Sequence, residues 1–168
     1  MRAMVAGLIL GVLTAAAPLS AVAAEVEIHY APTENLERID VELLHKAEKS
    51  IDFAAFILSD WVIADALADA RRRGVKVRVV LDGSQDHVLD RLADLGDAVH
   101  MKRTRPIMHL KSYLVDGRIL RWGSANFSAS GLKKQDNDLA ITRDPELVRR
   151  FAERFEDIWS RAEPLRRP

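Results

Sequence analysis

Between His109 and Asn126, a small set of polar residues occurs at spacings that could serve one chemical reaction. The stretch reads H-x-K-x4-D-x6-G-S-x-N and contains His109, Lys111, Asp116, Ser124 and Asn126. A neutral imidazole can act as a nucleophile, and an imidazolium can act as an acid. A lysine supplies a point charge for a phosphate oxygen, while a hydroxyl and an amide supply neutral hydrogen bonds. The set therefore predicts cleavage of a phosphodiester, a reaction that depends mainly on positioning and charge neutralisation.

The strand periodicity of two residues should bring these side chains together. Side chains two residues apart point to the same face of a strand, so His109 and Lys111 share one face. Ser124 and Asn126 have the same spacing at the end of the next strand. Asp116-Gly117 between them is a pair typical of a hairpin turn. We expect the other four side chains to meet at one end of a sheet, with Asp116 in a supporting role.

The pattern resembles the signature of the phospholipase D superfamily, whose members break phosphodiester bonds through a histidine nucleophile. A chance H-x-K-x4-D in a chain of this length is expected about once per hundred proteins, and the G-S-x-N offsets lower that by roughly a thousandfold. His100-Met-Lys102 is also H-x-K, but Ile107 stands where the aspartate would be. We therefore interpret His100 as an ordinary strand residue. The remaining histidines receive the same structural interpretation: His29, His45 and His87.

The resemblance implies a double displacement without metal or cofactor. One His109 would attack phosphorus to form a phosphohistidine, and a second would protonate the leaving oxygen and later activate water. Lys111, Ser124 and Asn126 would bind the phosphate. The motif occurs once in this chain, whereas the family needs two copies for each active site. We therefore expect an isologous homodimer in which a twofold axis pairs two copies of His109.

A carboxylate should also orient the histidine from behind. In the short nucleases of the superfamily this group is a glutamate in an E-N pair before the next strand. Here the stretch reads Gln135-Asp136-Asn137-Asp138, so Asp136 matches the pair with a shorter acid. There are two alternatives: Asp138 is the orienting carboxylate, or the stretch is a polar loop without a catalytic role. We predict that Asp136 orients His109.

Two groups of basic residues flank the motif and could hold a polyanion. Lys102, Arg103 and Arg105 precede His109, and Lys133-Lys134 follows Asn126. The alternative is a solvated basic face, which is what runs of charged residues usually form. The chain as a whole is not basic, since it has 25 Lys+Arg against 25 Asp+Glu. Any binding of nucleic acid must therefore depend on a local patch. Two aromatic residues, Trp61 and Phe127, could stack on bases or line the cleft. For Phe127 we favour core packing instead.

The first 24 residues are typical of a secretory signal peptide. Arg2 precedes a short apolar run, and Ala21-Val22-Ala23-Ala24 provides an A-x-A exit, so cleavage is expected after Ala23 or Ala24. An uncleaved membrane anchor is the alternative, but Pro18 and Ser20 favour a cleavage region. No other segment is long and apolar enough to span a membrane. The absence of cysteine fits a periplasmic or secreted protein that needs no disulfides, and it excludes thiol catalysis.

Strand and helix patterns alternate along residues 25–168, which we expect to form a single catalytic domain. Strands are predicted at 25–30, 50–58, 75–81, 99–102, 109–115, 119–123 and 139–142. Helices are predicted after Thr33, after Ser59 or Asp60, around 88–95, and from Asp144-Pro145. The class is therefore α/β, with a mixed sheet between helices. The resemblance implies the same α/β/α sandwich, since I-D-F-A-A-F, R-G-V-K-V-R-V-V-L-D and the last helix with Trp159 also look like the short bacterial nucleases.

These observations predict a secreted endonuclease of low sequence specificity that hydrolyses DNA, with RNA as a second substrate. The first alternative is a phospholipid hydrolase of phospholipase D type, which would need an apolar rim that the sequence does not show. The second alternative is an inactive nucleic-acid-binding module. The intact motif argues against it, because a dead copy would have little reason to keep Lys111 and Asn126 together with His109.

Overall fold

A mixed eight-stranded sheet runs through the part of the chain that the computed structural model describes, residues 25–84 and 86–165. The predicted signal peptide lies outside this range, and for residues 86–91 only the backbone is described. The strands are β1 Val26–Ala31, β2 Ser50–Ala55, β3 Lys76–Asp82, β4 Val99–Lys102, β5 Lys111–Val115, β6 Ile119–Gly123, β7 Asn137–Thr142 and β8 Glu163–Pro164. Their spatial order is β1-β7-β6-β5-β2-β3-β4-β8, with β2, β3 and β4 parallel and the other pairs antiparallel.

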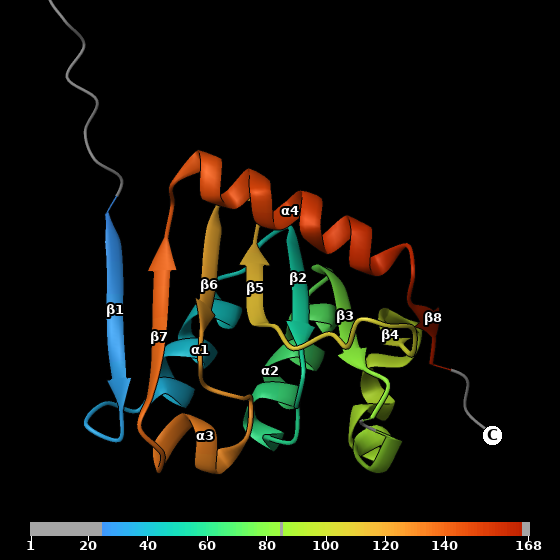
Figure 1. The fold of residues 1–168 in the computed structure, drawn as a ribbon, viewed down its shortest axis with the longest axis horizontal. Helices are drawn as coiled ribbons and strands as arrows, with labels where there is room; N and C mark the ends of the chain where they lie inside the picture. Colours follow the sequence, from blue (N-terminus) through green and yellow to red (C-terminus); the bar gives the residue numbers. More distant parts are fainter. Residues whose placement is uncertain (1–24, 85, 166–168) are drawn as a thin grey trace, which may run out of the picture.

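Helices cover both faces of this sheet, which confirms the predicted α/β class. The helices are α1 Leu36–His45, α2 Trp61–Arg72, α3 Ala129–Lys133 and α4 Pro145–Trp159, together with the 3-10 segment η1 Asp86–Ala98. In Figure 1, α4 crosses the strands on one side, and α1 and α2 lie on the other. Alternation along β2 explains the two layers: Phe53 packs towards α1 and α2, and Ala54 packs towards α4.

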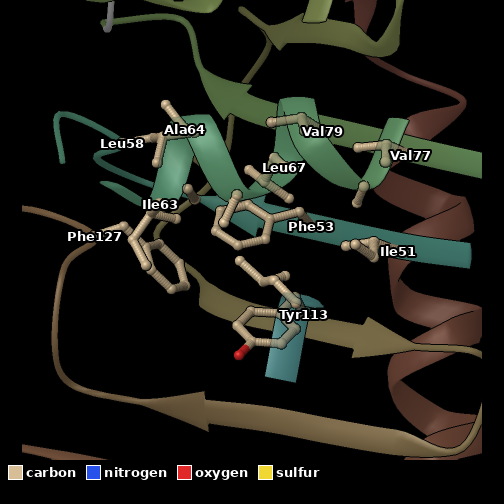
Figure 2. Close-up of a cluster of buried hydrophobic side chains, with 14 of the residues drawn as sticks. Ile51, Phe53, Leu58, Ile63, Ala64, Leu67, Val77, Val79, Tyr113 and Phe127 are labelled. Atoms are coloured by element: carbon tan, nitrogen blue, oxygen red, sulfur yellow. The ribbon is translucent and has the colours of Figure 1, made fainter. Parts of the chain in front are cut away.

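The larger core lies between the sheet and helices α1 and α2. Figure 2 shows Phe53 of β2 and Tyr113 of β5 packed against Phe127, which follows β6. The Phe53 ring centroid lies 5.2 Å from that of Tyr113 and 4.4 Å from that of Phe127. Full burial of Phe127 confirms core packing as its role rather than base stacking. This aromatic cluster fixes the end of β6 against β2 and β5.

Several element boundaries differ from the sequence prediction. Asn35, not Thr33, caps α1, because the Asn35 side chain accepts from the Arg38 amide while the Thr33 hydroxyl donates to the Tyr30 carbonyl. Strand β2 ends at Ala55 rather than at residue 58, and β5 begins at Lys111 rather than at residue 109. The alternative cap Asp60 is confirmed for α2. Helix α3 and strand β8 were not predicted, because each is too short to show a hydrophobic period.

None of the helices within the described ranges is both long and apolar enough to cross a membrane.

Candidate active site

The two halves of the motif meet at one edge of the sheet because β5 and β6 form an antiparallel hairpin. Tyr113 of β5 pairs with Arg121 of β6, so the start of β5 and the end of β6 lie at the same edge. Strand β2 ends beside them, since Ala55 pairs with Lys111. The loops and strand ends at this edge, towards the lower side of Figure 1, therefore carry the predicted site residues other than Asp116.

His109 and Lys111 are in direct contact. The Lys111 Nζ lies 2.8 Å from Nδ1 and 3.3 Å from Nε2 of the His109 ring, and it donates to the His109 main-chain oxygen at 2.9 Å. The Lys111 side chain is buried, and burial lowers the pKa of its ammonium below the ordinary 10.5. His109 itself is exposed at the edge. The pair thus presents a solvent-accessible imidazole beside a partly desolvated positive charge.

The ring of Phe56 packs against both His109 and Lys111, a contact that the sequence did not predict. Its ring centroid lies 4.2 Å from that of His109 and 5.2 Å from the Lys111 Nζ. The Phe56 amide donates to the Leu110 carbonyl at 2.7 Å, which attaches the chain before β5 to the end of β2. The sequence shows Phe56 only as one residue of an apolar run, so no local pattern marks its contact with His109.

Ser124 and Asn126 lie in the turn that follows β6. The Ser124 amide donates to the Asp138 carboxylate at 2.9 Å, and the Ser124 hydroxyl donates to Asn137 Oδ1 and accepts from the Asp138 amide, both at 3.0 Å. The Asn126 side-chain oxygen is buried, and no described residue forms a hydrogen bond with it. A buried polar atom without a partner is costly, and a bound ligand is one of the groups that can satisfy it.

The two candidate carboxylates have different surroundings. Asp136 is exposed, and Asp138 accepts from Ser124. These hydrogen bonds from Ser124 lower the pKa of Asp138 below its usual range, although partial burial acts in the opposite direction. Among the contacts of the described chain, neither carboxylate forms a hydrogen bond to His109. Asp136 therefore stays a predicted orienting residue, and Asp138 fixes the backbone of Ser124.

Asp116 lies at the far end of the hairpin from His109. Its carboxylate accepts from the main-chain amides of Glu48 at 3.2 Å, Lys49 at 2.7 Å and Ser50 at 3.0 Å. Burial would raise the pKa of Asp116, but these amides outweigh it and hold the pKa below the usual range. Asp116 therefore ties the hairpin turn to the start of β2, which agrees with the supporting role expected for it.

Lys102 was predicted to bind substrate, but its position in the structure does not allow this. Its side chain is buried, and its ammonium donates to the main-chain oxygens of Thr104 at 2.6 Å and Pro106. Asp82 accepts from the Met108 amide at 2.9 Å in the same region. Lys102 and Asp82 therefore hold the loop that leads into His109, and the Lys102 ammonium is not presented to a polyanion.

The remaining basic residues divide between solvent and structural contacts. Arg103 and Arg105 are exposed on the loop before His109, although Arg103 also donates to the Gly83 carbonyl at 3.1 Å. Lys133 forms an ion pair with Glu37 of α1, while Lys134 is exposed. The exposed positive charge nearest to His109 in the sequence is therefore that of Arg105.

Exposed apolar side chains also occur on segments at this edge. Ile107 is 51% exposed and precedes His109 by two residues. Trp61 is 53% and Val62 46% exposed where α2 begins, after the loop that follows β2. These exposed side chains contradict the expectation that the chain shows no apolar rim. Ile107 lies in a loop, and Trp61 and Val62 are the first two residues of α2, so no hydrophobic period indicates whether these side chains are covered.

His100 is a residue of β4 whose ring stacks on Trp159 at a centroid distance of 3.7 Å, as its structural interpretation predicts. Within residues 25–84 and 86–165, no three His, Asp or Glu side chains cluster in a way that could hold a metal ion.

Comparison with known proteins gives matches over most of these elements. A family model described as "Cardiolipin synthase, PLD-like domain" matches residues 41–159. A mitochondrial cardiolipin hydrolase of Homo sapiens is 34% identical over 127 residues, which are 71% of this chain and 49% of that protein. A phospholipase D of Rickettsia conorii is 30% identical over 135 residues, covering 78% of this chain and 68% of that protein. The matches span about half to two thirds of the length of these relatives.

Solved structures share the fold. Nuc from Salmonella typhimurium, described as a phospholipase D family member, superposes with a TM-score of 0.77 at 24% identity, over 86% of this chain and 99% of that one. NucT from Helicobacter pylori superposes with a TM-score of 0.75 at 20% identity, over 84% and 99%. The match of the family model to residues 41–159, which contain the whole motif from His109 to Asn126, shows that the chain belongs to the phospholipase D-like family.

Proposed function

We propose that this protein is a phosphodiesterase that cleaves its substrate through His109. The observation that carries the proposal is the contact of an exposed imidazole with the buried Lys111 ammonium, 2.8 Å from Nδ1, at the edge where Asn126 also lies. Relatives named cardiolipin hydrolase and phospholipase D support a reaction at a phosphodiester. Lys111 and Asn126 supply the charge and hydrogen bonds that the phosphate needs.

The reaction proceeds in two displacements. A ring nitrogen of His109 attacks phosphorus, the bond from phosphorus to the leaving oxygen breaks, and that oxygen takes a proton from an acid. Water then attacks the phosphohistidine, returns the histidine, and gives its proton to the group that served as the acid. Lys111 moves its donors from His109 to a non-bridging oxygen, and its charge offsets the charge that develops there.

A second copy of the chain supplies the acid. Three other histidines have described side chains, and each is engaged or placed elsewhere: His29 is hydrogen-bonded to Glu34, His100 stacks on Trp159, and His45 is the last residue of α1. An isologous homodimer pairs two identical patches about its axis, so it places a second His109 opposite the first. Asn126, whose buried side-chain oxygen has no partner in the described chain, belongs to the same shared site.

We infer that nucleic acid is the first candidate substrate. The loop before His109 exposes Arg103 and Arg105, which can contact phosphates on either side of the cleaved bond. The exposed charge is limited because Lys102 is buried, so binding would be modest, and its salt dependence would reflect a small number of phosphate contacts. Such contacts carry no base information, which fits a nuclease of low sequence specificity.

A phospholipid is the second candidate substrate, and a specific observation favours it. Ile107, Trp61 and Val62 are exposed apolar side chains on segments at the site edge, where they could enter the interfacial region of a bilayer. The relatives with the matched sequence also carry lipid-hydrolase names. Both candidates place a phosphodiester at His109 and differ only in what surrounds it.

The first experiment measures degradation of plasmid DNA and of vesicles containing cardiolipin by protein lacking residues 1–24, in excess EDTA. We expect cleavage that persists in EDTA and disappears in His109→Ala, with His29→Ala as the matched control that keeps activity. Cleavage lost in EDTA would contradict the metal-independent reaction. Binding of either substrate without turnover by the folded wild type would make the protein a binding module and sink the proposed activity.

Two further variants separate the substrates. Arg105→Ala should weaken DNA cleavage and reduce the slope of log K against log salt by about 1, as expected for one lost phosphate contact. Ile107→Ser should leave DNA cleavage within about twofold but reduce activity on vesicles if the loop enters the bilayer. If vesicles are instead the better substrate of the wild type, and vesicle activity falls in Ile107→Ser while DNA cleavage is unchanged in Arg105→Ala, the lipid assignment would replace the nuclease one.

We further propose that the protein acts in the periplasm or outside the cell. The N-terminal pattern of Arg2, an apolar run and Ala21-Val22-Ala23-Ala24 supports export, and the lack of cysteine fits it. Mass spectrometry of the N-terminus after expression with the full sequence tests this, and a chain that retains residues 1–24 would contradict cleavage.

A further inference from the structure

A fully buried ion pair lies beneath the motif and was not expected from the sequence. Arg121 of β6 donates to the carboxylate of Asp40 in α1 through Nε and Nη2, each at 2.8 Å. The Tyr113 hydroxyl donates to the same carboxylate at 2.9 Å. Both carboxylate oxygens of Asp40 thus accept hydrogen bonds. All three guanidinium nitrogens of Arg121 donate one, because Arg121 also contacts the main chain of β5.

The contact with the main chain joins Arg121 to β5, the strand that carries Lys111. Arg121 Nη1 donates to the main-chain oxygen of Lys111 at 2.8 Å. The ladder between β5 and β6 ends at Tyr113 and Arg121, whereas Lys111 pairs with Ala55 on its other side and Gly123 pairs with Leu139. The two strands therefore separate where they carry the motif, and the guanidinium bridges the opening between them.

The guanidinium also contacts the second half of the motif. Its carbon lies 4.6 Å from the ring centroid of Phe127, the residue that directly follows Asn126. Phe127 in turn accepts at its main-chain oxygen from the amides of Ser59 and Asp60. One buried side chain thus contacts the backbone of Lys111 and the residue after Asn126, and it is anchored to helix α1 through Asp40.

Stability alone is a weak reason for such a pair. In many proteins the free energy lost by removing two charges from water is as large as the free energy gained from their attraction. A protein with a well-packed apolar pair in place of the ion pair is often equally stable or more stable. What an apolar pair cannot do is donate to the Lys111 carbonyl. The fixed fork of a guanidinium can satisfy Asp40 and this carbonyl at once, which a lysine ammonium on a flexible stem does not reproduce.

We propose that Arg121, anchored by Asp40, is a positioning residue that holds the Lys111 backbone, and with it His109, at the correct distance from Asn126 for the reaction proposed above. Arg121 does not touch the substrate. It acts through the main chain of Lys111 and through Phe127. The inference rests on the proposed function for its kinetic consequence and on geometry for its effect on His109.

The test uses Arg121→Lys and the double variant Asp40→Leu/Arg121→Met in the full mature protein, with bis(p-nitrophenyl) phosphate as the probe. Arg121→Lys keeps the charge beside Asp40 and loses the bond to the Lys111 carbonyl. We expect kcat to fall at least tenfold in both variants and KM to change less than threefold. We also expect the alkaline limb of the pH profile, which we assign to the Lys111 ammonium, to move. The double variant should keep most of the wild-type stability to urea.

Arg78→Met is the matched control. Arg78 is another arginine in an ion pair, with Asp52 at 2.7 Å and Glu156 at 2.7 Å. It is only partly buried, packs on α4 and is not part of the proposed site. Its kcat should stay at the wild-type value. Wild-type kcat and pH profile in folded Arg121→Lys would overturn the positioning role.

A second readout keeps this inference separate from the proposed activity. If the wild type and Arg78→Met hydrolyse no phosphodiester, the proposed function has failed. The ¹⁵N chemical shifts of the His109 ring then test whether Arg121 positions this histidine. We expect these shifts to change in Arg121→Lys and to match the wild type in Arg78→Met. Ring shifts that are identical in all three proteins would overturn the inference whatever the activity.

Discussion

The Nζ atom of Lys111 lies 2.8 Å from Nδ1 of His109, and it also donates to the main-chain oxygen of that histidine at 2.9 Å. An ammonium has donors and no acceptor, so the contact requires a ring nitrogen with a free lone pair. The arrangement places the positive charge beside the atoms that would attack phosphorus. It also means that a change at Lys111 acts on the nucleophile as well as on phosphate binding.

Lys111→Arg should lower kcat by roughly 10- to 100-fold, because a planar fork does not replace a compact ammonium in a buried position. Burial lowers the pKa of Lys111, so in the wild type its charge is lost, and kcat falls, at a pH below 10.5. The guanidinium stays charged in this range, so the alkaline limb should be absent in the variant. The pH dependence of kcat from pH 6 to 10.5 checks this. An unchanged limb in Lys111→Arg would assign it to another group.

Asp136→Asn should reduce kcat if this carboxylate orients His109, because the neutral amide stabilises the charged imidazole less. Asp138→Asn should act differently: it weakens the bond from the Ser124 amide and displaces the turn after β6. Single-turnover rates and KM on a common phosphodiester distinguish the two. Wild-type turnover in Asp136→Asn, together with a loss in Asp138→Asn, would transfer the orienting role to Asp138.

Asp116→Asn should destabilise the protein by about 1–3 kcal/mol at pH 7, since one oxygen acceptor and the charge are lost opposite three main-chain amides. The folded-state pKa of Asp116 lies below 3.8, so the unfolded chain takes up the proton first as the pH falls. Its stabilising contribution is therefore complete above pH 3.8 and is lost as the pH falls through the folded-state value. Urea unfolding at pH 7 and pH 3 should show a smaller pH dependence in the variant.

Asp65→Asn, an exposed substitution in α2, is the control for the loss of one acidic charge. The kcat of folded Asp116→Asn should stay within about threefold of the wild type, because the carboxylate lies at the far end of the hairpin from His109. A large loss of kcat without loss of stability would instead assign Asp116 a direct part in the reaction.

Gly131→Ala should impair activity more than stability. A Cβ at this position in α3 would lie 2.6 Å from the main-chain oxygen of Asn126 and 2.9 Å from the Ser128 hydroxyl, so the turn carrying Asn126 must shift. If Asn126 binds the phosphate as proposed, its displacement by a fraction of an ångström should lower kcat roughly tenfold. Ser130→Ala in the same helix is the control, because Ser130 is exposed. Equal kcat in the two variants would show that α3 does not position Asn126.

The sequence alone determined the features that depend on short spacings. Alternation and turn chemistry predicted the hairpin of β5 and β6, and with it the meeting of His109 and Lys111 with Asn126 at one edge. Apolar runs predicted β2 as a strand covered on both faces, and the Asp144-Pro145 start predicted α4. These signals are local, because each residue pattern lies within one element or two adjacent ones.

Only the tertiary structure decided which polar side chains face solvent and which are used inside the fold. Lys102 looked like part of a basic patch, but its ammonium is taken by the carbonyls of the loop that leads to His109. Asp40 and Arg121 are 81 residues apart, and nothing near either residue in the sequence indicates the other. Burial and pairing of charges depend on how distant elements pack, and a charged residue has the same local pattern whether water or a partner surrounds it.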